Sequence, residues 1–153
     1  MTTDTQRIYS TRRLAIVNAL VEKLKGIDGE NEMLSNVYEN VHPRLKFWDE
    51  VDEFPAIHVS AGSETREYQG AGYKDRFLSV NLRIYVNEED AVEALEKLLE
   101  DVETVVENNS SLTYYDNRGK KSSTHQITVV SITTDEGVLE PLGVGEMLLQ
   151  VRY

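Results

Sequence analysis

A strict two-residue alternation over residues 77–86 constrains the fold of this chain more than any other feature of its sequence. From Leu78 to Val86, every second residue is leucine, valine or isoleucine. The residues between them are Ser79, Asn81, Arg83 and Tyr85. Because successive side chains of a strand point to opposite faces, this pattern predicts a β-strand with an apolar inner face and a polar outer face. We therefore expect a sheet that is covered on one side.

Other segments with the same alternation supply further strands. Residues 56–61 follow Pro55, and proline suits the first position of a strand because its missing N–H is not needed there. Residues 125–133 and 147–153 predict two more strands, and residues 37–41 are compatible with a short one. The sequence therefore predicts four or five strands.

The segment between the two central strands is long and polar. Residues 62–76 hold three acids and three bases, with a glycine on each side of Ala71. Glycine accepts the backbone angles of tight turns, so we expect a long β-hairpin arm with its tip at residues 70–72. Its tyrosines and basic residues are typical of protein interfaces, and an idle flexible loop is the alternative. The candidate interface residues are Arg66, Tyr68, Tyr73, Lys74 and Arg76.

Two amphipathic helices complete the predicted elements. The first begins after Ser10 or Thr11 and ends at Gly26. The second follows Asn87, which we predict to be its N-cap, and ends near Asn108. Outside its apolar face lies a row of acids, namely Glu93, Glu96, Glu100 and Glu103. Such a row is ordinarily a solvated helix face, and a surface that repels an anionic partner is the alternative.

The order of these elements defines the fold class. A helix, two or three strands, a second helix and two further strands predict an α+β fold. We expect a four- to five-stranded mixed sheet with two helices packed on one face and the long β-hairpin arm. Residues 1–153 are expected to form a single domain, with residues 1–9 as a mobile N-terminal arm and residues 110–123 as a loop.

The charge of the chain disfavours one class of partner. It carries 16 basic and 27 acidic residues, a net charge of −11, which opposes binding to a nucleic-acid backbone. The acids are concentrated in residues 87–107, with nine acids and one base, whereas residues 1–25 hold five bases and two acids. This asymmetry favours a polarised surface that complements a second copy of the chain.

Residue patterns typical of catalysis are missing from the sequence. The chain has no cysteine, which excludes disulfides, thiol nucleophiles and cysteine-bound metals. The pair Gly70-x-Gly72 is only a weak candidate for a phosphate-binding loop. The pair Glu39-x-x-His42 is followed by a proline and lies in no helical pattern, which disfavours a metal site on a helix. His58 is predicted to be a partly exposed strand histidine, with a metal or general-base role as the alternative, and His125 adds no recognisable ligand spacing. We therefore expect no enzymatic activity, no cofactor and no metal site.

The sequence also gives expectations about location. Residues 1–6 are polar and lack the apolar core of a signal peptide. No stretch approaches the ~20 apolar residues of a membrane-spanning helix. We expect a soluble protein that is made in a cytoplasm and does not contact a membrane.

Several segments taken together resemble a known family. They are the strand start Phe54-Pro55 with residues 56–65, the alternating strand 77–86 with its acidic helix, the turn-rich segment 132–143 and the closing residues 149–153. In this order they resemble the tail terminator, or tail completion, proteins of long-tailed bacteriophages, and most of all those of siphophages. The resemblance covers residues 12–153.

This resemblance implies a structural virion protein with an α+β fold. Members form a homo-hexameric ring on the end of the tail tube, stop its polymerisation and provide the surface that joins tail to head. The implied partners are further copies of the chain, the tail tube protein and a head completion or connector protein, while DNA passes through the lumen without specific binding. The implied location is the virion tail at the head–tail junction, after assembly in the host cytoplasm. The family implies no catalytic residues.

If the chain forms a ring around DNA, the charge of the channel lining can be predicted. Two alternative functions also remain open. A channel that must let DNA slide is expected to be acidic, and Glu93, Glu96, Glu100 and Glu103 are the candidates for its lining. One alternative is a connector or neck completion protein. The other is a small ligand-binding α+β regulatory module, or an enzyme subunit with a site between protomers.

Overall fold

The sheet has five strands, and the strictly alternating segment lies in its centre. In the computed structural model, which describes residues 11–153, the strands of this sheet are β1 (Val41–His42), β2 (Ala56–Tyr68), β3 (Lys74–Asn87), β6 (Gln126–Thr134) and β7 (Leu142–Arg152). Their order is β1-β2-β3-β7-β6. Strand β1 runs parallel to β2, and the other neighbouring pairs are antiparallel. The predicted mixed sheet is therefore confirmed, and the short β1 is its fifth strand.

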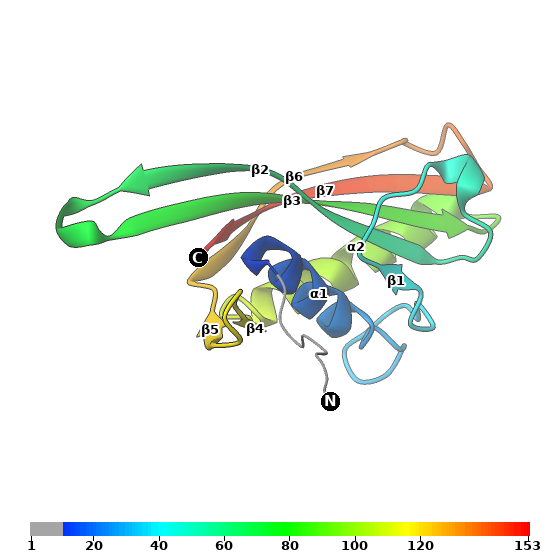
Figure 1. Cartoon of the computed structure of the whole chain (residues 1–153). Coiled ribbons are helices and arrows are strands. Elements are labelled where there is room, and N and C mark those ends of the chain that lie inside the picture. The colour runs from blue at the N-terminus through cyan, green and yellow to red at the C-terminus, as the bar shows by residue number, and fades with distance from the viewer. Residues whose placement is uncertain (1–10) are drawn as a thin grey trace, which may run out of the picture.

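Both helices lie on one face of this sheet (Figure 1). Helix α1 (Arg12–Leu24) packs against β1 and β2, and helix α2 (Ala91–Asn108) packs against β3, β6 and β7. Leu20 of α1, Leu98 of α2 and Leu82 of β3 are fully buried in the core between the two layers. Burial of these faces is the main favourable contribution to folding. The predicted α+β class, with two helices on one face, is confirmed.

The start of α2 lies later in the chain than the sequence predicts. The N-cap is Asp90, whose Oδ1 accepts a hydrogen bond of 3.1 Å from the backbone N–H of Glu93. The predicted cap, Asn87, is instead the last residue of β3 and pairs with Leu142 of β7. Strand pairing therefore takes Asn87 and delays the helix. At α1 the prediction is confirmed, because Thr11 accepts from the N–H of Leu14.

Strand β7 approaches the start of α2 closely. A Cβ atom on Gly143 would lie 2.7 Å from Cγ2 of Val86 and 3.4 Å from Cβ of Ala91. Real Cβ atoms do not come this close to a neighbour, so only glycine fits here without a shift of the core. The close packing fixes α2 against the sheet from which the hairpin arm projects.

Residues 110–123 are not the simple loop that the sequence predicts. They contain a small hairpin of β4 (Thr113–Tyr115) and β5 (Lys121–Ser123). The carboxylate of Asp116 accepts the backbone N–H groups of Arg118 and Lys120 and closes the turn. Tyr114 of this hairpin is buried in the core, and its ring meets Tyr153 edge to face. The prediction of a mobile arm at residues 1–9 lies outside the described residues.

Candidate assembly surfaces

The hairpin arm is the most prominent feature of the molecule. Strands β2 and β3 stay paired as far as Tyr68 and Lys74, and a short 3-10 turn, η2 (Gly70–Gly72), joins them. Figure 1 shows this ribbon reaching well beyond the helices and the other strands. At the tip, Gly72 has a φ of +81°, which glycine adopts without strain, and Ala71 also has a positive φ of 63°. The predicted hairpin and its tip are confirmed.

The structure separates the five candidate residues of the arm into two groups. Tyr68 and Tyr73 are 71% and 73% exposed, and the ammonium of Lys74 lies 5.6 Å from the centre of the Tyr68 ring. Arg66 is exposed but lies nearer the body, where it pairs with Arg76 across the two strands. Arg76 lies at this base too, with its guanidinium 5.4 Å from the centre of the Tyr153 ring. The two tyrosines and Lys74 are therefore exposed on the outer part of the arm, and the two arginines lie at its base.

The base of the arm is held by a buried carboxylate. The side chain of Glu64 is only 6% exposed, and it accepts hydrogen bonds from the Tyr153 hydroxyl at 2.5 Å and from Arg66 Nε at 2.7 Å. Arg13 of α1 lies 4.0 Å from the same carboxylate and donates to the carbonyl of Gly62. A β-bulge between Ala61 and Glu64 marks the point where the arm leaves the body.

These contacts determine the ionisation of Glu64. Burial acts to raise the pKa of Glu64, but the hydrogen bonds from Tyr153 and Arg66 and the charges of Arg66 and Arg13 lower it below its ordinary value. Burial and the bond to Glu64 raise the pKa of Tyr153. The backbone of Tyr153 also pairs with Arg76 of β3. No local sequence pattern indicates this anchor, because its members come from three distant parts of the chain.

The acidic row of α2 lies on the helix surface as predicted. Glu93, Glu96 and Glu100 are exposed, and Glu103 is half-buried. The carboxylate of Glu93 pairs with Lys97 at 3.1 Å. Burial, together with the charges of the neighbouring glutamates Glu107 and Glu100, raises the pKa of Glu103. Within the described residues, this row is a continuous source of negative charge on one helix.

One acid of α2 has a structural role that the sequence does not reveal. Asp101 is 2% exposed and accepts the backbone N–H groups of Leu34 and Ser35 at 2.7–3.0 Å. A buried carboxylate is stable only with such partners. Asp101 therefore fixes the connecting segment between α1 and β1 against α2.

The prediction that His58 is partly exposed is wrong. His58 is 2% exposed, and its Nδ1 lies 2.9 Å from the carbonyl oxygen of Arg44. Its ring stacks on His42 at 5.3 Å. Burial is the main cause that lowers the pKa of His58. Residues 44–48 cross the outer face of the sheet and cover His58. The alternation of residues 56–61 describes only their own strand, so it does not predict that another segment covers this histidine.

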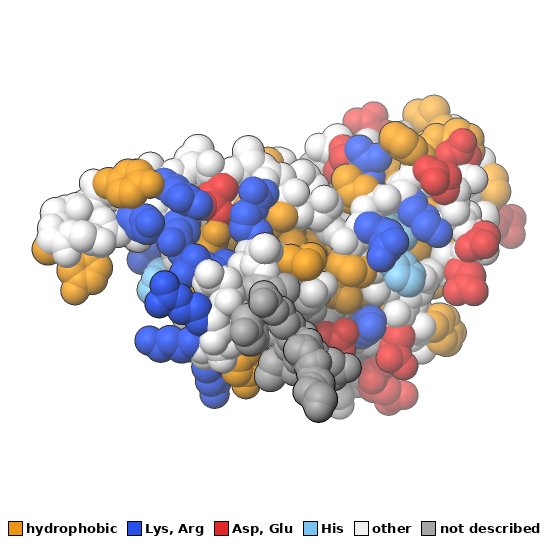
Figure 2. Space-filling view, in the orientation of Figure 1, with side chains coloured by type: hydrophobic (Ala, Val, Ile, Leu, Met, Phe, Trp, Pro, Cys, Tyr) orange, Lys and Arg blue, Asp and Glu red, His pale blue; other side chains and the backbone are white. Residues whose placement is uncertain are grey.

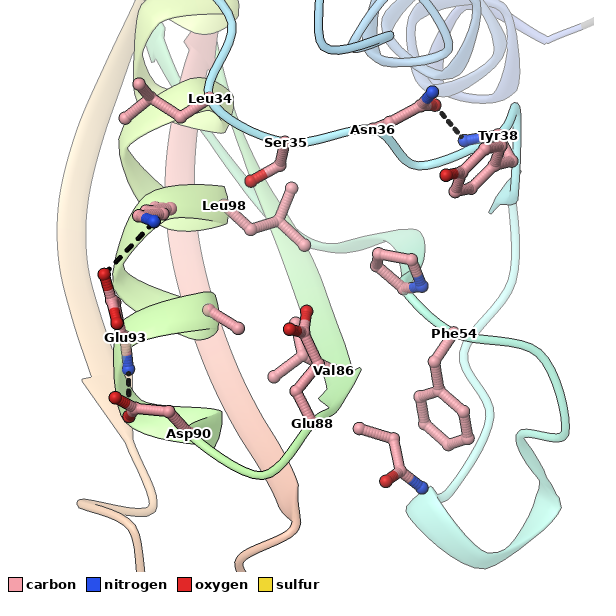
Figure 3. Close-up of a pocket in the computed structure, with 14 residues that line it drawn as sticks. Leu34, Ser35, Asn36, Tyr38, Phe54, Val86, Glu88, Asp90, Glu93 and Leu98 are labelled. Carbon is pink, nitrogen blue, oxygen red and sulfur yellow. Dashed lines mark hydrogen bonds and ion pairs between the residues drawn. The ribbon is translucent and has the colours of Figure 1, made fainter.

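A cavity of about 460 Å³ lies between the start of α2 and the connecting segments (Figure 3). Leu34 and Tyr38 line one side, and Asp90 and Glu93 of α2 line another. Asp90 already caps α2, and Glu93 pairs with Lys97. These acids stabilise the helix. Across residues 11–153, no group of three or more histidine, aspartate or glutamate side chains is placed to hold a metal ion.

Charge is separated along the molecule. Figure 2 shows basic side chains gathered around the base of the arm and acidic side chains at the opposite end. Among the basic residues, Arg13 and Arg66 approach Glu64, and Arg152 approaches Asp75 at 3.9 Å. The polarised surface expected from the sequence is therefore present in the described part of the chain.

The decisive comparison is with protein families. A sequence model described as "Bacteriophage Tail Tube Terminator Protein" matches residues 10–153. The chain belongs to the bacteriophage tail tube terminator family. It is 34% identical over 149 residues to the tail tube terminator protein of Escherichia phage T5, and the match covers 92% of each chain. The resemblance inferred from the strand and turn pattern is confirmed.

A solved structure supports the fold of this terminator family member. A chain from the virion of a native gene transfer agent particle has a TM-score of 0.54 and 11% sequence identity. The match covers 90% of this chain and 93% of the other chain. At this identity the likeness concerns the fold alone. Among the described residues, no helix is long and apolar enough to cross a membrane.

Proposed function

We propose that this protein ends the growth of a phage tail tube by forming a homo-hexameric ring on its end. The observation that carries the proposal is the family match over residues 10–153, supported by the T5 relative whose name is tail tube terminator. The ring also provides the surface for the head completion or connector protein. Its location is the virion tail at the head–tail junction, after assembly in the host cytoplasm.

The arm is proposed as the main intermolecular element. Its outer part presents the exposed side chains of Tyr68, Tyr73 and Lys74, and Arg66 is exposed at its base beside Glu64. Tyrosine adds a large contact area with little loss of side-chain freedom, which suits an interface. Anchoring by Glu64 and Tyr153 holds the arm in one direction before assembly, and this lowers the entropic cost of binding.

The acidic row of α2 is proposed to line the channel. Glu93, Glu96, Glu100 and Glu103 carry negative charge on one helix, and such a surface repels the phosphates of passing DNA. The protein is proposed to act without catalysis and without a cofactor. Its role is to occupy the end of the tube and present a new surface.

The test is to add the protein to polymerising tail-tube subunits. We expect shorter tubes that carry a cap at one end and no longer elongate, as seen by electron microscopy. Tubes that grow to the same length with and without the protein would contradict terminator function. If the protein instead binds only the head connector, the connector completion alternative is correct.

A shortened arm separates assembly from folding. Residues 68–74 are replaced by a two-residue turn between the paired residues Glu67 and Asp75, which leaves the anchor residues Glu64 and Arg66 in place. The domain is expected to keep its melting temperature, since the removed residues bury little apolar surface, but it should lose ring formation and capping. Normal capping by this variant would show that the arm is idle.

A further inference from the structure

A second exposed feature lies on the outer face of the sheet, at the end away from the arm. A groove of about 260 Å³ opens there between the ends of β3, β6 and β7 and the 3-10 turn η1 (Trp48–Glu50). Its lining includes Trp48, Arg83, Tyr85, Thr133, Leu139 and Glu146. The helices cover the other face of the sheet, so this groove is independent of the core.

The groove presents aromatic and apolar side chains to solvent. Trp48 is 55% exposed, Leu139 is 41% exposed and the neighbouring Phe47 is 64% exposed. Arg83 lines the same groove, with its guanidinium 6.0 Å from the centre of the Phe47 ring and its Nε 3.0 Å from Glu146. Tryptophan and arginine are the residues most often found at the energetic centre of interfaces.

The groove is held in shape before any partner arrives. The hydroxyl of Tyr85 donates a hydrogen bond of 2.6 Å to the carbonyl oxygen of Lys46, which ties the segment before Trp48 to the sheet. On the other side, Asp135 accepts the backbone N–H groups of Leu139 and Val144. Both walls are therefore fixed by hydrogen bonds, and a ligand need not order them.

The arm of another copy complements this groove in the types of its side chains and in charge. Its tip carries Tyr68 and Tyr73, which are exposed and have an aromatic character suited to Trp48. The ammonium of Lys74 is opposite in charge to the carboxylate of Glu146, which pairs with Arg83 at 3.0 Å and whose side chain is still 51% exposed. Figure 2 shows apolar and acidic side chains gathered at the end opposite the arm.

We propose that the Trp48 groove of one copy receives the arm of the next copy. The tyrosines of the arm pack against Trp48 and Leu139, and Lys74 faces Glu146. The two surfaces differ and lie at opposite ends of the molecule, so the contact is head to tail. A contact of this kind closes into a ring when the rotation between copies permits. The inference rests on the proposed ring and names the surfaces that join its subunits.

The test uses two variants that are each defective in one surface. The arm variant carries Tyr68→Ser and Tyr73→Ser, and the groove variant carries Leu139→Arg. All three positions are exposed, so both variants should keep the wild-type circular dichroism and melting temperature. Matched controls are Tyr115→Ser and Leu34→Arg, at residues that are 51% and 59% exposed and lie away from the arm tip and the groove. If Leu139→Arg fails to fold, Thr133→Arg at another exposed residue of the groove replaces it.

Mixing the variants identifies a head-to-tail contact directly. Each variant alone is expected to remain a monomer in analytical ultracentrifugation, whereas the wild type and both controls form rings. An equimolar mixture should give a 1:1 complex, because the arm variant supplies an intact groove and the groove variant supplies an intact arm. That complex cannot extend further.

The single tryptophan of the chain supplies a second measurement. Ring formation should shift the emission of Trp48 to shorter wavelength and reduce its quenching by acrylamide several-fold. Rings in which Trp48 stays as accessible as in the monomer would overturn the inference, as would a groove variant that forms rings or caps tubes normally. Those outcomes leave the proposed terminator function intact. A wild-type protein that caps no tubes would instead contradict that function itself.

A groove variant that forms normal rings but no longer caps tubes would also overturn the inference. It would show that the occupant of the groove is the tail tube protein and not a second copy. Loss of both ring formation and capping, with the 1:1 complex in the mixture, supports the inference.

Discussion

Two hairpins of the molecule, the arm and the short hairpin of β4 and β5, place a tyrosine in opposite surroundings. The arm formed by β2 and β3 holds Tyr68 and Tyr73 in solvent, whereas the hairpin of β4 and β5 buries Tyr114 against Tyr153. Both hairpins have polar turns and similar residue types. The difference is position, because the short hairpin packs beside α1 and the long one extends past every other element. A tyrosine is therefore buried or exposed according to what the tertiary structure places next to it.

The largest expected effect comes from the shared core beneath both hairpins. Leu82→Ala in β3 or Leu98→Ala in α2 should lower the free energy of unfolding by about 2–5 kcal/mol, because each leaves a cavity in a fully buried region. Chemical denaturation measures this. Wild-type stability in both variants would show that the core is not where the two layers meet.

The comparison of the hairpins is tested by matched tyrosine changes. Tyr114→Ala removes a buried ring and should cost about 3 kcal/mol, whereas Tyr73→Ala on the arm should change the free energy of unfolding by less than about 0.5 kcal/mol. Equal effects at the two positions would break the proposed distinction. Thermal unfolding of the two variants beside the wild type is sufficient.

A smaller effect, dependent on pH, is expected at the anchor of the arm. Glu64→Gln should cost about 1 kcal/mol at pH 7, because it removes a charged partner from Tyr153 and Arg66. The lowered pKa of Glu64 means that its stabilising contribution is complete above its pKa in the unfolded chain, about 4.3, and is lost as the pH falls through the folded value. The difference in melting temperature between wild type and variant should therefore shrink below about pH 4.

The matched control for this measurement is Glu67→Gln, at an exposed residue of the same strand. It is expected to leave the melting temperature unchanged over the same pH range. A constant difference between Glu64→Gln and wild type from pH 7 to pH 3 would show that the charge of Glu64 does not stabilise the base of the arm.

The smallest effect on stability is expected on the exposed face of α2. Changing Glu93, Glu96, Glu100 and Glu103 to lysine should cost only a few tenths of a kcal/mol per lost helix ion pair, of which Glu93 with Lys97 is one. The quadruple variant should differ clearly from wild type in function, because its assembled rings would bind duplex DNA with a strong salt dependence. Electrophoretic mobility at several salt concentrations measures this.

A charge-matched control is available on other exposed segments. Glu30, Glu32, Glu39 and Glu53 are exposed and lie outside α2, and their change to lysine alters the net charge equally. If both quadruple variants bind DNA to the same extent, the total charge is responsible. If rings of the α2 variant ignore DNA at low salt, this helix does not line the channel.

The sequence by itself determined the elements that repeat locally. The alternation from Leu78 to Val86 predicted β3, the glycines around Ala71 predicted the tip of the arm, and Thr11 predicted the start of α1. Each of these signals is complete within a few neighbouring residues, because strand and helix periods and turn angles are local properties. The α+β class followed from their order.

Only the tertiary structure decided which surfaces are covered. Asn87 became a strand residue because β7 pairs with it, and His58 became buried because residues 44–48 cross the outer face of the sheet. The anchor of the arm joins Arg13, Glu64 and Tyr153, which lie far apart in the chain. Burial and pairing depend on neighbours that are distant in sequence, so no local pattern contains them. For the same reason, the groove around Trp48 exists only in the folded protein.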